Sequence, residues 1–136
     1  MEDMYDNKKE MIDLARMLDE RNAGHVLVLD IAEQSSIADY FVIATVSSEA
    51  YLRGLVDDID RYCDSQSLDV RMPDRRHDGS GWTVVDGGWF VIHLMTKEIR
   101  EFYDLERLWF HSPRLYGEEL QSSSSTGQSS SSSVSS

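Results

Sequence analysis

The chain has 136 residues, 40% of them hydrophobic and 28% charged, which is typical of a soluble globular protein with one sizeable core. Its net charge is −12, from 25 acidic and 13 basic residues, so it lacks the positive field with which most proteins bind phosphate backbones. No apolar run approaches the roughly 18 residues of a membrane span. We therefore expect neither a membrane protein nor a nucleic-acid binder, and the field favours a basic partner.

The N-terminal region predicts a helix followed by two strands. Apolar residues recur at helical spacing over residues 4–21, with Asp3 or Asp6 as the cap, and the acidic start of the chain has no apolar stretch typical of a secretory signal. Two short apolar runs follow, Val26–Ile31 and Tyr40–Thr45. Eight residues connect them, too few for a helical crossover, so we expect antiparallel neighbours.

A second amphipathic helix is predicted over Glu49–Ser65, capped by Ser47 or Ser48. Cys63 falls on its apolar stripe, which indicates a core side chain rather than a nucleophile. A single cysteine cannot form an internal disulfide, which favours a reducing, cytoplasmic location. The carboxylates at 57, 58 and 60 lie on the solvated face and point apart, so they do not predict a metal site.

The middle of the chain predicts an edge strand and a hairpin. The alternating run Leu68–Met72 is typical of a short edge strand that ends at Pro73. In Gly81–Met95, the Asp86-Gly87 pair predicts a type I′ turn between two strands. The second strand is apolar at nearly every position, which places it inside the sheet. Four hairpin residues are predicted to be core: Val84, Phe90, Ile92 and Leu94.

The C-terminal third predicts a helix after Thr96, which Asp104 can split in two, and regular structure that stops at Pro113 and Gly117. From Gln121 the chain is almost entirely serine and is predicted to be disordered. We expect one domain over residues 1–117 and a tail over 118–136. The fold class is α/β, with helices packed on a mixed sheet of four or five strands.

Signals for catalysis are weak. The Gly79–Gly81 loop leads into a strand with no lysine after it, unlike a phosphate-binding loop. The four histidines are scattered without metal-ligand spacing, and His93 lies in the most apolar strand, as a core histidine would. His77-Asp78 has no nucleophile near it in sequence. We therefore predict no enzyme, no metal and no cofactor.

Aromatic residues flank the hairpin turn and continue into the segment behind it. Trp82, Trp89, Tyr103 and Trp109, with arginines among them, are residue types that anchor interfaces. The same residues are equally suited to filling the core, and both readings stay open at this point.

Three motifs, in order, resemble one known family. They are DYFVIAT at Asp39–Thr45 followed by Ser48, the hairpin of Gly81–Asp86 with Val91–His93, and REFYDLERLW at Arg100–Trp109. Together they are similar to the ribosomal silencing factors, also called Iojap or YbeB-like proteins. The resemblance implies a nucleotidyltransferase-like sandwich without the catalytic motif.

The resemblance also implies a function. Such proteins bind a basic protein of the large ribosomal subunit (large-subunit protein fourteen) at the intersubunit face, block joining of the small subunit and repress translation when nutrients are short. Organelle relatives act in large-subunit assembly, and homodimers occur in the family. Silencing, assembly and a surviving nucleotide-binding enzyme are the three alternatives that remain open.

The sequence departs from the family pattern at Val46, where glycine is usual, at Asp78-Gly79, and at Gly87–Trp89, where Tyr-Gly-Asp is usual. We hypothesise that the hairpin and the following helix form the docking face. Apolar side chains would be buried anchors, and Asp86 and Glu106 would face Lys or Arg of the partner. The candidate residues are Trp82, Asp86, Trp89, Arg100, Tyr103 and Glu106.

Overall fold

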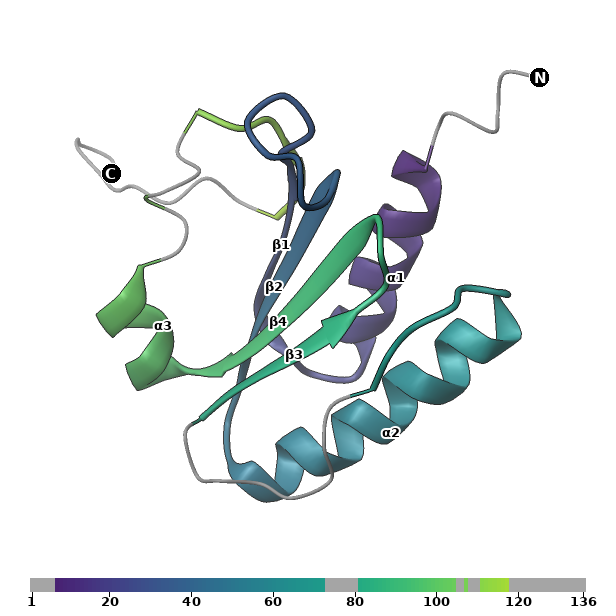
Figure 1. Ribbon diagram of the computed structural model, residues 1–136. Coiled ribbons are helices and arrows are strands. Elements are labelled where there is room, and N and C mark those ends of the chain that lie inside the picture. Colours follow the sequence, from purple (N-terminus) through teal and green to yellow (C-terminus); the bar gives the residue numbers. More distant parts are fainter. Residues whose placement is uncertain (1–6, 73–80, 105–106, 108–110, 118–136) are drawn as a thin grey trace.

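The computed structural model describes residues 7–72, 81–104, 107 and 111–117, and within them the chain forms an α/β fold around a five-stranded mixed sheet. The element boundaries are α1 Lys8–Glu20, β1 Gly24–Asp30, β2 Tyr40–Val46, α2 Glu49–Ser65, β3 Trp82–Asp86, β4 Phe90–Thr96, α3 Lys97–Tyr103 and β5 Arg114–Tyr116. The strands lie in the order β3-β4-β2-β1-β5. Helices α1 and α2 lie on one side of this sheet and α3 on the other (Figure 1).

The pairing of the strands confirms most of the predicted topology. β1 and β2 are antiparallel neighbours, as are β3 and β4, and β2 and β4 run parallel at the centre. The parallel pair is joined through α2, which is the long crossover that parallel strands need. β4 lies between two other strands, as its continuous apolar run predicts.

The first face of the sheet carries the larger hydrophobic cluster. It combines the apolar stripes of α1 and α2 with the strand side chains beneath them. Phe90, Ile92 and Leu94 are buried there, as predicted, and so is Cys63. Ser48 rather than Ser47 caps α2, because its Oγ accepts a hydrogen bond from the Tyr51 N–H at 3.1 Å.

Only α3, among the described helices, lies on the second face. A smaller cluster there contains Leu27, Leu29, Ile43 and Met95, with Ile99 of α3 packed against it. Val84 also points to this side because it alternates with the buried Val85 and pairs with His93. The prediction that Val84 is core is wrong: 41% of it is exposed, since it lies on an edge strand.

The hairpin turn differs from the predicted type I′. That turn needs positive φ at Asp86 and Gly87, but the left-handed residue is Gly88, at φ 84. The Trp89 N–H donates to the Gly87 carbonyl at 3.0 Å, so Gly88 is the centre of a three-residue turn. Asp86 Oδ1 accepts from the Gly88 N–H at 2.8 Å and holds this turn from the side.

The edges of the sheet also differ from the prediction. Leu68–Met72 is not a strand, because a single isolated bridge joins Arg71 to Asp86. Pro73, which lies outside the described residues, has no N–H to donate to a strand ladder, as the sequence already indicated. The short edge strand β5 was missed, because Pro113 and Gly117 were interpreted as ends of regular structure when they flank a strand.

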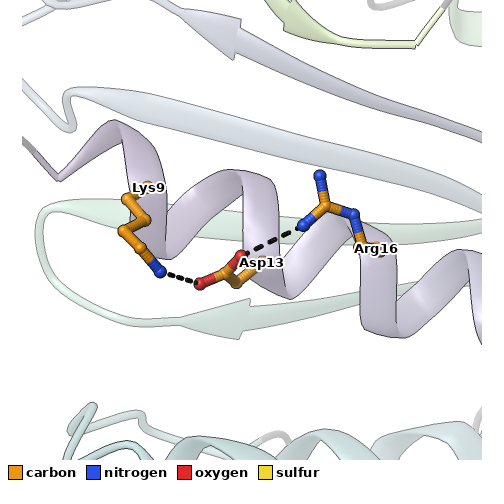
Figure 2. Close-up of polar contacts among 3 residues, drawn as sticks. All are labelled: Lys9, Asp13 and Arg16. Atoms are coloured by element: carbon orange, nitrogen blue, oxygen red, sulfur yellow. Dashed lines mark hydrogen bonds and ion pairs between the residues drawn. The ribbon is translucent and has the colours of Figure 1, made fainter.

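The start of the first predicted helix and the serine tail involve residues outside the described part of the chain, as do Asp3 and Asp6. Within that part, α1 begins at Lys8 and ends at Glu20 with Arg21 as its C-cap, and Asn22 takes a left-handed φ of 71. Its solvent face carries paired charges: Asp13 accepts from Lys9 at 3.0 Å and from Arg16 at 3.3 Å (Figure 2). These exposed pairs contribute little to stability.

Candidate functional site

A row of aromatic rings crosses the second face of the sheet and continues onto α3. We define the aromatic row as Phe41, His93, Trp82, Tyr103 and Phe102. Consecutive ring centroids lie 4.6, 5.9, 5.0 and 4.9 Å apart, within the range of favourable edge and tilted contacts. The row therefore links three strands and α3 into one continuous surface.

His93 is the centre of the row. It is 8% exposed, and its Nδ1 accepts a hydrogen bond from Trp82 Nε1 at 3.2 Å. Burial lowers the pKa of His93 from 6.5 to about 4, so the imidazole is neutral at neutral pH, with its proton on Nε2. No partner for Nε2 is found among the described residues. The prediction that His93 is a core histidine is confirmed, and its hydrogen bond orients Trp82.

The row becomes more exposed toward α3. Phe41 and Trp82 are half-buried, whereas Tyr103 is 50% and Phe102 78% exposed. Val84, beside Trp82 on the same face of β3, adds a further exposed apolar side chain. Large apolar side chains that gather at the surface beside a rigid sheet are typical of a protein-binding site.

Asp86 and Trp89 lie at the other end of the hairpin. Asp86 is four residues from Trp82, or roughly 13 Å along a strand. Trp89 is half-buried against the first cluster, with its ring in edge contact with Tyr40 and Phe90. Together with residues 67–71, these two line an open groove beside the turn. The structure thus brings Trp82 and Tyr103 together and keeps Asp86 and Trp89 apart from them.

Arg100 is on α3 but points inward. It is 8% exposed, and its Nη1 donates to the His25 carbonyl at 2.7 Å and to Thr45 Oγ1 at 2.9 Å. Glu106 lies outside the described residues. Of the six predicted docking residues, the half-buried Trp82 and the exposed Tyr103 thus form an aromatic contact on the α3 side of the sheet.

Other chemistry finds little support in the described part of the chain. Residues 7–72, 81–104, 107 and 111–117 contain no group of acidic, histidine or cysteine side chains that could hold a metal. Over the same ranges, no helix has both the length and the apolarity to cross a bilayer. Burial raises the pKa of the Cys63 thiol to about 11, which makes it a poor nucleophile.

Three residues contribute to this surface without having been predicted to do so from the sequence. Phe102 was noted only as part of an aromatic segment, Phe41 was assigned to a buried strand, and Val84 was assigned to the core. No signal in the sequence paired Phe41 with His93, because their two strands were not predicted to be neighbours. The parallel register of β2 and β4, which puts Phe41 against Val91 and next to His93, was not predictable from spacing alone.

Comparisons with known proteins agree with one another. The family model described as "Ribosomal silencing factor during starvation" matches residues 5–136. A Bacillus subtilis protein named "Ribosomal silencing factor RsfS" is 31% identical over 108 residues, 79% of this chain and 91% of that protein. A mouse protein named "Mitochondrial assembly of ribosomal large subunit protein 1" is 34% identical over 101 residues, 71% of this chain and 43% of that protein.

Solved structures support the fold. A crystal structure of a Chromobacterium violaceum protein superposes with a TM-score of 0.68 at 24% identity, covering 83% of this chain and 89% of that one. A crystal structure of a Bacillus halodurans protein gives a TM-score of 0.62 at 25% identity, covering 78% of this chain and 96% of that one. The arrangement of sheet and helices described above is therefore similar to folds already solved.

Proposed function

Since the chain belongs to the family of ribosomal silencing factors, we propose that it binds the large ribosomal subunit and represses translation when nutrients are short. Its contact on the ribosome is a basic protein of the intersubunit face (large-subunit protein fourteen). Bound there, it blocks joining of the small subunit by steric exclusion. It acts in the cytoplasm as a regulator, not as an enzyme, and needs no cofactor.

The observation that carries this proposal is the exposed end of the aromatic row. Trp82 is fixed by His93, and Tyr103 and Phe102 extend the surface outward on α3. Rigid aromatic side chains are the residue types that dominate binding energy at the centre of protein interfaces. The net charge of −12 favours a basic protein over ribosomal RNA as the surface that receives them.

Removing an anchor tests the proposal. Trp82→Ala and Tyr103→Ala are each expected to cost ~2 kcal/mol of binding, roughly thirtyfold in affinity for isolated large subunits. Co-sedimentation through a sucrose cushion measures this loss, and circular dichroism establishes that each variant is folded. Ile37→Ala is the matched control, because Ile37 is 77% exposed but lies outside the aromatic row. If both aromatic variants are folded and bind as well as wild type, this docking face is wrong.

A role in large-subunit assembly is the second candidate, favoured by the name of the mouse relative. It uses the same docking face and differs in the time at which the protein is bound. Ribosome profiles of a deletion strain in rich and starved medium distinguish the two. Immature large subunits in rich medium support assembly, whereas excess joined ribosomes during starvation support silencing.

Two further measurements test the absence of nucleotide binding and the oligomeric state. Calorimetry with ATP, CTP and Mg²⁺ is expected to show no binding, and micromolar nucleotide affinity would instead support an enzyme of nucleotidyltransferase-like fold. Light scattering of the free protein tests the homodimer that the family resemblance implies.

A further inference from the structure

The short helix α3 carries the exposed part of the aromatic row but cannot be stable by itself. It has 7 residues, whereas isolated helices need about 12–15 to be even marginally stable in water. Thr96 caps its start by accepting from the Ile99 N–H at 3.4 Å, and Asp104 ends it in a left-handed conformation at φ 49. The position of Phe102 and Tyr103 therefore depends on what ties α3 to the sheet.

Arg100 supplies such a tie. Its guanidinium reaches from α3 to two strands at once, with Nη1 donating to Thr45 Oγ1 on β2 and to the His25 carbonyl on β1. Hydrogen bonds from a charged donor are shorter and stronger than neutral ones, and burial strengthens them further. A planar guanidinium also fixes the direction of the helix that carries it, because its donors point in fixed directions.

The acceptor on β1 lies in a local irregularity of the sheet. Gly24 pairs with Thr45 and Leu27 with Ile43, so β1 has one extra residue in this stretch. His25 lies inside this bulge at φ 45, a left-handed conformation that non-glycine residues rarely adopt. Bulges often re-aim a backbone group, and here the carbonyl of the strained residue is the one that receives Arg100.

We propose that Arg100 and the His25 bulge form a positioning clamp that holds α3 so that Tyr103 and Phe102 stay aligned with Trp82 for docking. The inference rests on the proposed function for its consequence, but the clamp itself is a property of the free protein. Arg100 thus acts through Tyr103 and Phe102 and does not touch the partner. When the clamp is loosened, the side chains of Tyr103 and Phe102 must be ordered during binding, and this cost lowers the affinity for the partner.

The test uses the full chain and four single variants. Arg100→Met removes both hydrogen bonds, Arg100→Lys keeps the charge but replaces the planar guanidinium, and Thr45→Val removes one acceptor. Arg53→Met, on an exposed position of α2, is the charge-matched control. Affinity for large subunits is expected to fall about tenfold for Arg100→Met and by less for the two milder variants, while Arg53→Met stays at the wild-type value.

A double-mutant cycle with Tyr103→Ala separates positioning from direct contact. If Arg100 acts through Tyr103 and Phe102, Arg100→Met costs clearly less affinity once Tyr103 is already alanine, because only Phe102 is left to position. Additive losses would mean that Arg100 contacts the partner itself and would overturn the proposal. Should Arg100→Met fail to fold, the same cycle is run with Thr45→Val.

Hydrogen exchange in the free protein tests the clamp independently of ribosome binding. The Asp104 amide, which donates to the Arg100 carbonyl at 2.9 Å, is expected to exchange at least several-fold faster in Arg100→Met and Thr45→Val, with the central strands unchanged. Unchanged exchange in α3 would refute the clamp even if the protein binds ribosomes. Faster exchange with no ribosome binding by the wild type would instead refute the proposed function and leave the clamp intact.

Discussion

Acidification is expected to destabilise the protein through the buried imidazole of His93. The neutral imidazole is the form that fits the aromatic row, since its Nδ1 accepts from Trp82 at 3.2 Å. Burial lowers its pKa from 6.5 to about 4. A group whose folded pKa is lowered in this way binds its proton less readily in the folded state than in the unfolded state. The stabilising effect is therefore complete above pH 6.5 and is lost as the pH falls from 6.5 through 4.

The size of the effect follows from that change in pKa. One pKa unit corresponds to 1.36 kcal/mol, so a shift from 6.5 to about 4 represents about 3 kcal/mol as a ceiling. Because His93 is only 8% exposed, solvent screens little of this contribution. Protonation also places a hydrogen on Nδ1, where Trp82 now donates, so the ring that we assign to docking loses its acceptor in the same step.

Urea unfolding between pH 7.5 and 4 measures the effect against a variant that cannot titrate. His93→Asn keeps an acceptor close to the position of Nδ1, and both proteins share the same carboxylates and the same remaining histidines. The free energy of unfolding of the wild type is expected to fall more steeply with pH than that of the variant, by up to about 1.4 kcal/mol per pH unit. Parallel curves for the two proteins over this interval would refute the reasoning.

Two further predictions concern local structure. Ser48→Ala is expected to lower the free energy of unfolding by about 1 kcal/mol, because it removes the cap of α2. Ser47→Ala, at the exposed neighbouring position, is expected to change it by only about a few tenths of a kcal/mol. Urea unfolding compares the two variants, and equal losses would contradict the assigned cap. Gly87→Ala is expected to lower the thermal midpoint more than Gly88→Ala, because a Cβ at Gly87 would lie 2.3 Å from the buried ring of Phe90, whereas at Gly88 it meets open space and costs only about 1–2 kcal/mol for its φ of 84.

The elements with strong periodic patterns were predictable from the sequence. The stripe of α2 predicted Glu49–Ser65, which is the observed helix, and the apolar runs predicted β1, β2 and the interior position of β4. Each of these elements buries enough apolar surface that its own pattern reveals its environment. Burial and pattern agree here because the packing partners cover a whole face of the element.

The edges of the sheet were harder to predict, because the exposure of an edge residue depends on which neighbouring elements cover it. Val84 is apolar, as a core residue would be, but nothing in its own strand reveals that this strand lies at the edge of the sheet and leaves Val84 exposed. The Leu68–Met72 run alternates as an edge strand would, yet within it a single bridge, Arg71 to Asp86, forms with β3. β5 is three residues long, too short for any period to be recognised.

The candidate site was predictable in its residue types but not in its arrangement. The hairpin motif singled out Trp82 and the helix motif Tyr103, and the fold does bring the two rings together. The role of Arg100 could not be inferred, because its acceptor His25 is 75 residues away and lies in a one-residue bulge. Sequence patterns indicate which face of a helix or strand is buried. A contact such as Arg100 to His25 depends instead on the register between strands that are distant in sequence.

The two faces of the sheet differ in a way that bears on how variants should be interpreted. Of the described charged or imidazole side chains, the two that are buried, His93 and Arg100, both lie on the side of α3. The first cluster, beneath α1 and α2, is formed almost entirely of apolar side chains. Buried polar groups contribute less to stability than apolar ones but fix geometry more sharply. Truncations in the first cluster should therefore lower stability and leave ribosome affinity unchanged in whatever protein remains folded, whereas changes at His93 or Arg100 should reduce affinity by more than their effect on stability explains.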